Sequence, residues 1–262
     1  MKRYYTIVFF LLFGLSVSAQ ETEVYLGLGG MYSSFQDTRF TDVQFNKLTV
    51  IPELGFSIIS DKNYWHMNAY GYAFNEQFPN EDTITYSRLG YNVRFGYLRE
   101  LEPSFYMGVN WDIVDYYKRF TGLLGNGADS YKLSSDIYVS GKYLWNLDDN
   151  WRIRFGLDYG LFTFVNTEPS FGANFQQNII DNGLVTFIDD DTKRPWKLKN
   201  MAFKGFWEQF NIRTSFHVDY RRRLSLKYSW DLRRFADNKG YPVTDARHQM
   251  TLIFNLVNHQ KK

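Results

Sequence analysis

The chain alternates apolar and polar residues with a period of two along most of its length. In the stretch LGYNVRFGYL, residues 89–98, apolar side chains occupy the odd positions and Arg94 lies among the even ones. Successive side chains of a β-strand point to opposite faces, so this stretch predicts a strand with one apolar and one polar face. The polar face meets either the water around a soluble sandwich or the interior of a barrel whose outside meets lipid.

The same alternation predicts ten strands along the chain. They cover about 23–33, 48–59, 63–75, 84–98, 104–115, 131–146, 151–165, 206–220, 223–234 and 247–257. In the third strand, either the face with Trp65 or the face with His66 could lie outside. Gly27, Gly29 and Gly30 fall inside the first strand, where we expect them to leave room for bulky neighbours in the lumen.

The connections between these strands alternate in length. Long connections, about 34–47, 76–83, 116–130, 166–205 and 235–246, follow the odd-numbered strands, and short ones at 60–62, 100–103, 147–150 and 221–222 follow the even-numbered strands. Short periplasmic turns and long outer loops are typical of up-and-down barrels in the outer membrane. We therefore predict an all-β fold, an antiparallel transmembrane β-barrel of about ten strands (eight to twelve), with both termini in the periplasm.

The polar face of the predicted strands carries charges of both signs near the strand centres. They are Arg94, Asp112, Asp136, Arg154, Asp158, Arg213, Asp219, Lys227 and Asp231. A barrel of about ten strands has a narrow lumen, and an unpaired charge buried there costs several kcal/mol. We expect these residues to face the lumen and to form a network of ion pairs, with Arg94 directed at a carboxylate such as that of Asp112.

The N-terminus predicts export from the cytoplasm. Lys2 and Arg3 precede the apolar run 7–13, and Val17-Ser18-Ala19 has the small-residue pattern of a signal-peptidase site. We interpret residues 1–19 as a signal peptide, because the run is too short for a membrane-anchor helix, and 20–262 as the mature barrel. The chain has no cysteine, so it needs no disulfide in an oxidising compartment.

Composition narrows the classes of partner. Without Lys2 and Arg3 the chain has 28 basic and 28 acidic residues, which argues against nucleic acid as a partner. Phe, Tyr and Trp make up 19% of the residues, and Trp65, Trp111, Trp145, Trp151 and Trp230 lie near the ends of the predicted strands. Such aromatic residues are typical of the two membrane interfaces. The alternative is a soluble periplasmic β-sandwich or lipocalin-like barrel that binds an apolar ligand.

With this pattern of strands and connections, the mature chain resembles the small outer-membrane β-barrels of Gram-negative bacteria. Its last strand, HQMTLIFNLV at 248–257, looks like the terminal strand that the barrel-assembly machinery recognises, although five further residues follow it. The resemblance implies residence in the outer membrane, contact with outer-membrane lipid, and assembly by that machinery. It leaves a protein partner in the envelope open.

Candidate chemistry is sparse. The histidines at 66, 217, 248 and 259 lack the His-x-Ser pair that the resemblance implies for barrel lipases. His217 and Asp219 share a face, but in the reverse order of the Asp-x-His pair of omptin proteases, so they are weak catalytic candidates. Asp189, Asp190 and Asp191 in the connection 166–205 offer oxygen ligands for Ca²⁺, although solvated carboxylates are the simpler interpretation.

The function expected from the sequence is therefore non-enzymatic: a structural barrel, a partner of an envelope complex, or a narrow channel, with no cofactor. A membrane-embedded hydrolase, acting as a lipase or an omptin-like protease, is the alternative.

Overall fold

The computed structural model describes residues 21–37, 41–60, 62–78, 81–121, 129–170, 201–236 and 242–260. Its strands are β1 (Glu21–Asp37), β2 (Thr41–Ser60), β3 (Asn63–Phe78), β4 (Glu81–Glu102), β5 (Phe105–Thr121), β6 (Asp129–Asn146), β7 (Trp151–Ser170), β8 (Met201–Lys204), β9 (Gln209–Tyr220), β10 (Leu224–Ala236) and β11 (Pro242–Gln260). No helix among the described residues is long and apolar enough to span a membrane.

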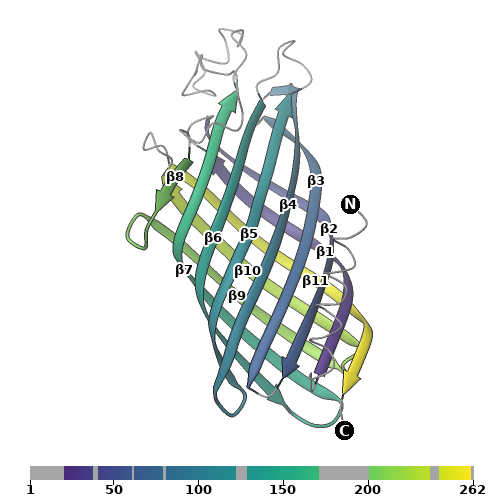
Figure 1. Cartoon of the computed structure of the whole chain (residues 1–262). Helices are drawn as coiled ribbons and strands as arrows, with labels where there is room; N and C mark the ends of the chain where they lie inside the picture. Colours follow the sequence, from purple (N-terminus) through teal and green to yellow (C-terminus); the bar gives the residue numbers. More distant parts are fainter. Residues whose placement is uncertain are drawn as a thin grey trace, which may run out of the picture.

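The strands form one antiparallel sheet that closes on itself. Each strand from β1 to β7 pairs with the next in the chain, β9 pairs with β7 and β10, and β11 pairs with both β10 and β1. The result is a slender cylinder of tilted strands (Figure 1). The prediction of an all-β, up-and-down barrel of about ten strands is confirmed, with β8 as one short extra strand.

The two ends of the barrel differ, and we name them by their connections. The turn rim carries the tight connections at 61–62, 103–104, 147–150 and 221–223, together with the start of β1 and the end of β11, and lies at the bottom of Figure 1. The loop rim is the opposite end. Toward the loop rim, β1 and β2 extend through polar residues such as Gln36 and Asn46.

Most of the long connections are shorter in the structure than the sequence predicted. Only residues 38–40 separate β1 from β2 and only 79–80 separate β3 from β4, where we expected connections at 34–47 and 76–83. The hairpins keep their backbone hydrogen bonds after the apolar face has given way to polar residues, so the period-two signal ends before the strand does. The connection between β7 and β8, residues 171–200, remains long.

The predicted strand 206–220 begins three residues later, as β9 at Gln209, because the sheet is broken before it. Tyr159 of β7 pairs with Ile212, but four residues further along β7, Thr163 pairs with Lys204, where an unbroken partner strand would have Glu208. Residues 205–208 therefore leave the sheet as a tight turn between β8 and β9. The turn carries the side chain of Trp207 outward, where it is 92% exposed.

The outer surface of the cylinder is apolar. Leu28, Val50 and Leu252 are among its exposed large side chains, while alternate residues point inward. In β3 the face with Trp65 lies outside, and Asn68 and Tyr70 are buried inside. Such an apolar outer face suits a barrel surrounded by hydrocarbon.

The tryptophans lie at two levels of this outer surface. Trp145 and Trp151 lie next to the turn rim, as expected for an aromatic girdle, but Trp111 and Trp230 lie in the middle of β5 and β10. The prediction that all of them lie near strand ends is wrong for these two, because the strands extend beyond the apolar region toward the loop rim.

The glycines of β1 have two different roles. A Cβ atom on Gly29 would lie 2.2 Å from the carbonyl oxygen of Met250 and 2.8 Å from the hydroxyl of Thr251, so the close approach of β11 requires glycine there. Gly30 points to the other face, and a Cβ atom there would meet nothing closer than 3.9 Å. The expectation that Gly30 makes room in the lumen is therefore wrong.

These neighbouring glycines give a matched test of the register between β1 and β11. We expect Gly29→Ala to destabilise the barrel by about 1–3 kcal/mol, because the added methyl group overlaps the backbone of the paired strand. Gly30→Ala should stay within about 0.5 kcal/mol of the unmodified protein. The measurement is the temperature at which the folded band, which migrates anomalously on an unboiled denaturing gel, is lost. Equal effects of the two substitutions would contradict this register.

Candidate functional site

The lumen of the barrel contains charged side chains from strands that are far apart in the sequence. The structure places all nine charged residues of the predicted lumen network inside the barrel: Arg94, Asp112, Asp136, Arg154, Asp158, Arg213, Asp219, Lys227 and Asp231. All are buried except Arg94, whose side chain is 11% exposed. Eight of them belong to two clusters of ion pairs, one toward each rim, and Lys227 forms a separate pair between the clusters.

The cluster toward the loop rim, which we name the outer cluster, depends on a β-bulge in β5. Arg94 pairs with Asp112 and Val93 pairs with Val114, so one extra residue, Ile113, interrupts the alternation. After the bulge the odd positions point inward, and Asp112 and Asp115 both face the lumen. The bulge therefore places two carboxylates on one wall, three residues apart.

Arg233 of β10 reaches across the lumen and joins these two carboxylates. Its Nη2 lies 2.5 Å from Asp112 and its Nη1 lies 2.8 Å from Asp115. Arg247 of β11 donates from Nη1 to the Asp115 carboxylate at 2.8 Å, and the Nζ of Lys132 on β6 lies 2.8 Å from the same group. Asp115 is thus held by cations from three other strands.

Asp112 is the second centre of the outer cluster. It accepts a hydrogen bond from Arg94 Nε at 2.7 Å and another from Arg213 Nη2 at 2.7 Å. Arg213 also contacts Asp231 at 3.0 Å and Asp158 at 3.4 Å. Because a guanidinium group donates along several fixed directions, Arg213 of β9 ties β5, β7 and β10 together at once.

The cluster toward the turn rim, the inner cluster, joins β1, β7 and β9. Arg152 donates to Glu21 and to Asp219, each at 2.7 Å, and also to Glu23. Arg154 donates to Glu23 at 3.0 Å and to Asp219 at 2.7 Å. Both carboxylate oxygens of Asp219 are therefore occupied by arginines.

Between the two clusters, a separate ion pair links β10 to β2. Lys227 Nζ lies 2.5 Å from Glu53, which also accepts hydrogen bonds from Tyr25 at 3.2 Å and Asn68 at 3.4 Å. The pair bridges residues 174 positions apart in the chain. It continues the polar network along the wall of the lumen.

Apolar side chains fill the lumen beyond the clusters. At the loop rim, Phe35, Tyr117, Val165, Phe235 and Val243 pack together, and the guanidinium of Arg88 lies 4.2 Å from the centre of the Phe35 ring. A second group near the turn rim consists of Tyr64, Leu98, Tyr106 and Leu144. It comes from β3 to β6 and lies across from the inner cluster, which comes from β1, β7 and β9.

The structure does not bring the two weak catalytic candidates together as a pair. His217 and Asp219 are not joined by any hydrogen bond in the described chain, and Asp219 is saturated by Arg152 and Arg154. No group of three or more potential metal ligands occurs among the described residues. Asp189, Asp190 and Asp191 lie outside the described residues.

Several members of the clusters were missed at the level of sequence. Glu53 and Arg247 lie inside predicted strands on the inward face, and Glu21 and Asp245 continue the same parity just beyond predicted strands, so the alternation was sufficient to find all four. Asp115 is different, because the bulge reverses the parity of β5. No local feature of the sequence marks that reversal.

Comparisons with known proteins concern the fold. No protein-family model matches the chain, and no curated protein matches it. Among solved structures, it is similar to the translocator domain of the autotransporter NalP from Neisseria meningitidis (6% identity, 97% of this chain, 96% of that chain, TM-score 0.49). It is also similar to the outer membrane protease OmpT from Escherichia coli (8% identity, 90% of this chain, 96% of that chain, TM-score 0.45).

A third similar structure is Neisserial surface protein A, with 8% identity over 89% of this chain and 97% of that chain and a TM-score of 0.33. All three are outer-membrane β-barrel proteins. A protease and an autotransporter translocator stand among them, and at these identities the likeness does not extend to an activity.

The outer cluster yields a prediction for stability. Asp112→Asn removes the negative charge that Arg94, Arg213 and Arg233 share, and leaves them partly unpaired in a buried site. We expect a loss of about 3–5 kcal/mol, the usual cost of breaking a buried ion pair. The same exchange at the exposed Asp149 in a short turn should change stability by less than about 0.5 kcal/mol. Urea titration of the refolded proteins in lipid vesicles measures both, and similar values for the two variants would contradict the role given to Asp112.

Proposed function

We propose that this chain is an integral outer-membrane protein whose barrel is closed to ions and solutes and whose role is non-enzymatic. The barrel would serve as a rigid structural element or as the docking partner of another envelope protein. The observation that carries the proposal is the outer cluster. Arg213, Arg233 and Arg247 cross the lumen to carboxylates on other strands, and all three are buried.

A closed lumen follows from the chemistry of this cluster. An ion that passes through would have to separate guanidinium groups from carboxylates in a site that offers little water in exchange. The packed side chains Phe35, Tyr117, Val165, Phe235 and Val243 at the loop rim add a further barrier, because narrow apolar constrictions exclude water. A wide aqueous channel is also ruled out by size, because it needs about sixteen strands.

The alternative of a hydrolase finds less support. An omptin-like pair would need His217 and Asp219 to cooperate, whereas the Asp219 carboxylate is held by Arg152 and Arg154. A soluble barrel that binds an apolar ligand would need an apolar interior, but the described lumen is lined mainly by charged and polar side chains.

We also propose that outer-membrane lipid surrounds the barrel and that both termini face the periplasm. The support is the apolar outer face together with the short connections at the rim that carries both ends of the described chain. Assembly by the barrel-assembly machinery belongs to the same proposal. Gly205–Glu208 would bring Phe206 and Trp207 to the level of the lipid, continuous with Phe203 on the outside of β8.

Planar-bilayer recording tests the closed lumen. We expect the purified, refolded protein to give no steady conductance, and Arg233→Ala to give brief openings, because the link between Asp112 and Asp115 is lost. Arg234→Ala is the matched control, since the next side chain along β10 is exposed on the outside. Stepwise, long-lived conductance of the unmodified protein would show a channel and overturn the proposal.

Contact with lipid is tested on the outer face. Leu28 is 61% exposed in the middle of β1. Leu28→Arg should destabilise the barrel by about 2–4 kcal/mol in bilayers if hydrocarbon covers this position. Gln44→Arg, at an exposed position toward the loop rim, should change little. If Leu28→Arg were tolerated within about 0.5 kcal/mol, as on a water-facing surface, lipid contact would be excluded.

A further inference from the structure

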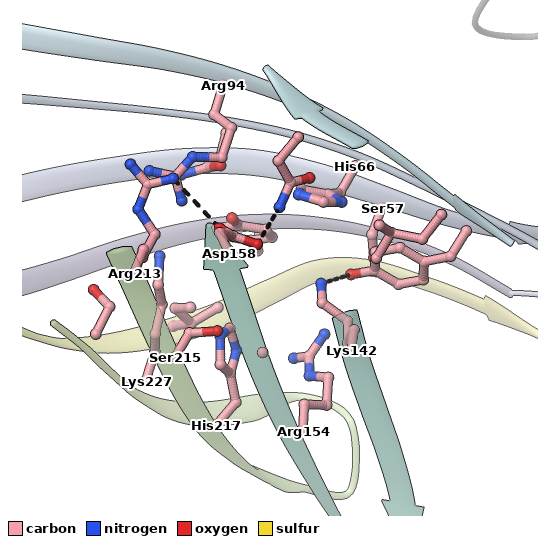
Figure 2. Close-up of a pocket in the computed structure, with 18 of the residues that line it drawn as sticks. Ser57, His66, Arg94, Lys142, Arg154, Asp158, Arg213, Ser215, His217 and Lys227 are labelled. Carbon is pink, nitrogen blue, oxygen red and sulfur yellow. Dashed lines mark hydrogen bonds and ion pairs between the residues drawn. The ribbon is translucent and has the colours of Figure 1, made fainter. Parts of the chain in front are cut away.

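The lumen contains a cavity of about 60 Å³ between the inner and outer clusters. Five basic residues line it, Arg94, Lys142, Arg154, Arg213 and Lys227, with Asp158 as the one lining carboxylate among the described residues. Figure 2 shows these side chains converging from several strands on the same space. The surroundings of the cavity are therefore strongly cationic.

Four of these five cations have carboxylate partners. Arg94 and Arg213 bind Asp112, Arg154 binds Glu23 and Asp219, and Lys227 binds Glu53. These partners lie behind the arginines and the lysine as seen from the cavity, since none of the four carboxylates lines it. Arg213 also contacts Asp158, the lining carboxylate, at 3.4 Å, whereas Arg94, Arg154 and Lys227 have their partners on the side away from the cavity.

Lys142 is the exception. Within the described parts of the chain, its ammonium group has no carboxylate within 4.0 Å. It donates a hydrogen bond to the Tyr64 hydroxyl at 3.0 Å, and its Nζ lies 4.1 Å from the centre of the Tyr64 ring. A ring and a hydroxyl compensate this partly buried ammonium only in part, because a charge withdrawn from water ordinarily requires an ionic partner.

Other polar atoms beside the cavity also lack a partner in the described structure. They are the Nδ1 atoms of His66 and His217 and the Nε of Arg154. The Arg154 Nε is a hydrogen-bond donor, and each imidazole can donate from one of its ring nitrogens. Together with Lys142, the site offers donors from β3, β6, β7 and β9.

We propose that this cavity binds a small monovalent inorganic anion of the size of chloride, which completes the charge balance at Lys142. The volume corresponds to about two water molecules, which suits a halide with a water and leaves no space for an organic acid. The excess of basic side chains in the lining excludes a metal cation, because like charges repel. This anion would be a structural component of the barrel, and the proposal stands whether or not the lumen conducts.

The first test compares stability in halide salts with stability in gluconate. The protein is refolded in sodium chloride, in sodium bromide, or in sodium gluconate of equal ionic strength, because gluconate is too large for the cavity. We expect the heat-induced loss of the folded gel band to occur about 2–4 °C higher in the halide salts. Lys142→Met keeps the length of the side chain and removes its charge, so it should abolish the difference between halide and gluconate.

Lys132→Met is the matched control. Lys132 is likewise a lumen-facing lysine of β6, and it is fully buried, but its Nζ lies 2.8 Å from Asp115 in the outer cluster. Its loss should lower the melting temperature equally in all salts and preserve the halide increment. Crystals of protein refolded in bromide should show an anomalous-scattering peak beside Lys142.

Three outcomes would overturn the proposal. Equal melting of the unmodified protein in halide and gluconate would leave water as the occupant of the cavity. A halide increment that survives in Lys142→Met would place the anion elsewhere. A bromide peak outside the cavity, with none inside it, would do the same.

Discussion

The structure depends on one constraint: charges enclosed in a narrow barrel must find partners across the lumen. Arg233 meets this constraint by joining Asp112 and Asp115, which lie on the same wall because β5 carries a bulge. Without the bulge, the alternation would direct Asp115 toward the outer surface, where a charge facing hydrocarbon is destabilising. A single extra residue in one strand therefore decides whether the outer cluster can form.

The remainder of the lumen follows from the same constraint. The inner cluster uses Glu21 and Glu23 at the very start of β1, and the outer cluster uses Asp245 and Arg247 near the start of β11. Ion pairs between strands far apart in sequence form only when the barrel has closed, since β1 must pair with β11 to bring their residues together. Closure of the sheet and pairing of the charges are thus coupled, which favours a barrel that is either complete or unfolded.

Alternation with a period of two was sufficient to predict the fold class, the number of long strands and the inward side of most strands. It could not locate the ends of the hairpins at the loop rim, because backbone pairing there continues through polar residues such as Gln36 and Asn46. It also could not show the bulge at Ile113 or the turn at 205–208. Both depend on which strand lies alongside, so they are properties of the register and not of the local sequence.

The two walls of the lumen near the turn rim differ in chemistry, and this difference leaves an excess of positive charge in the middle of the lumen. Near the turn rim, apolar residues of β3 to β6, such as Leu98 and Leu144, lie across from the arginines of β7. Lys142 on β6 therefore lies on the wall whose neighbours are apolar, while the carboxylates of the inner cluster are taken up by Arg152 and Arg154 on the other wall. The carboxylates of the inner cluster pair with arginines, which bind two carboxylates at once, and among the described residues Lys142 has the Tyr64 hydroxyl and no carboxylate as its partner. A local excess of positive charge in the middle of the lumen is thus a result of how the strands divide apolar and ionic residues between the two walls.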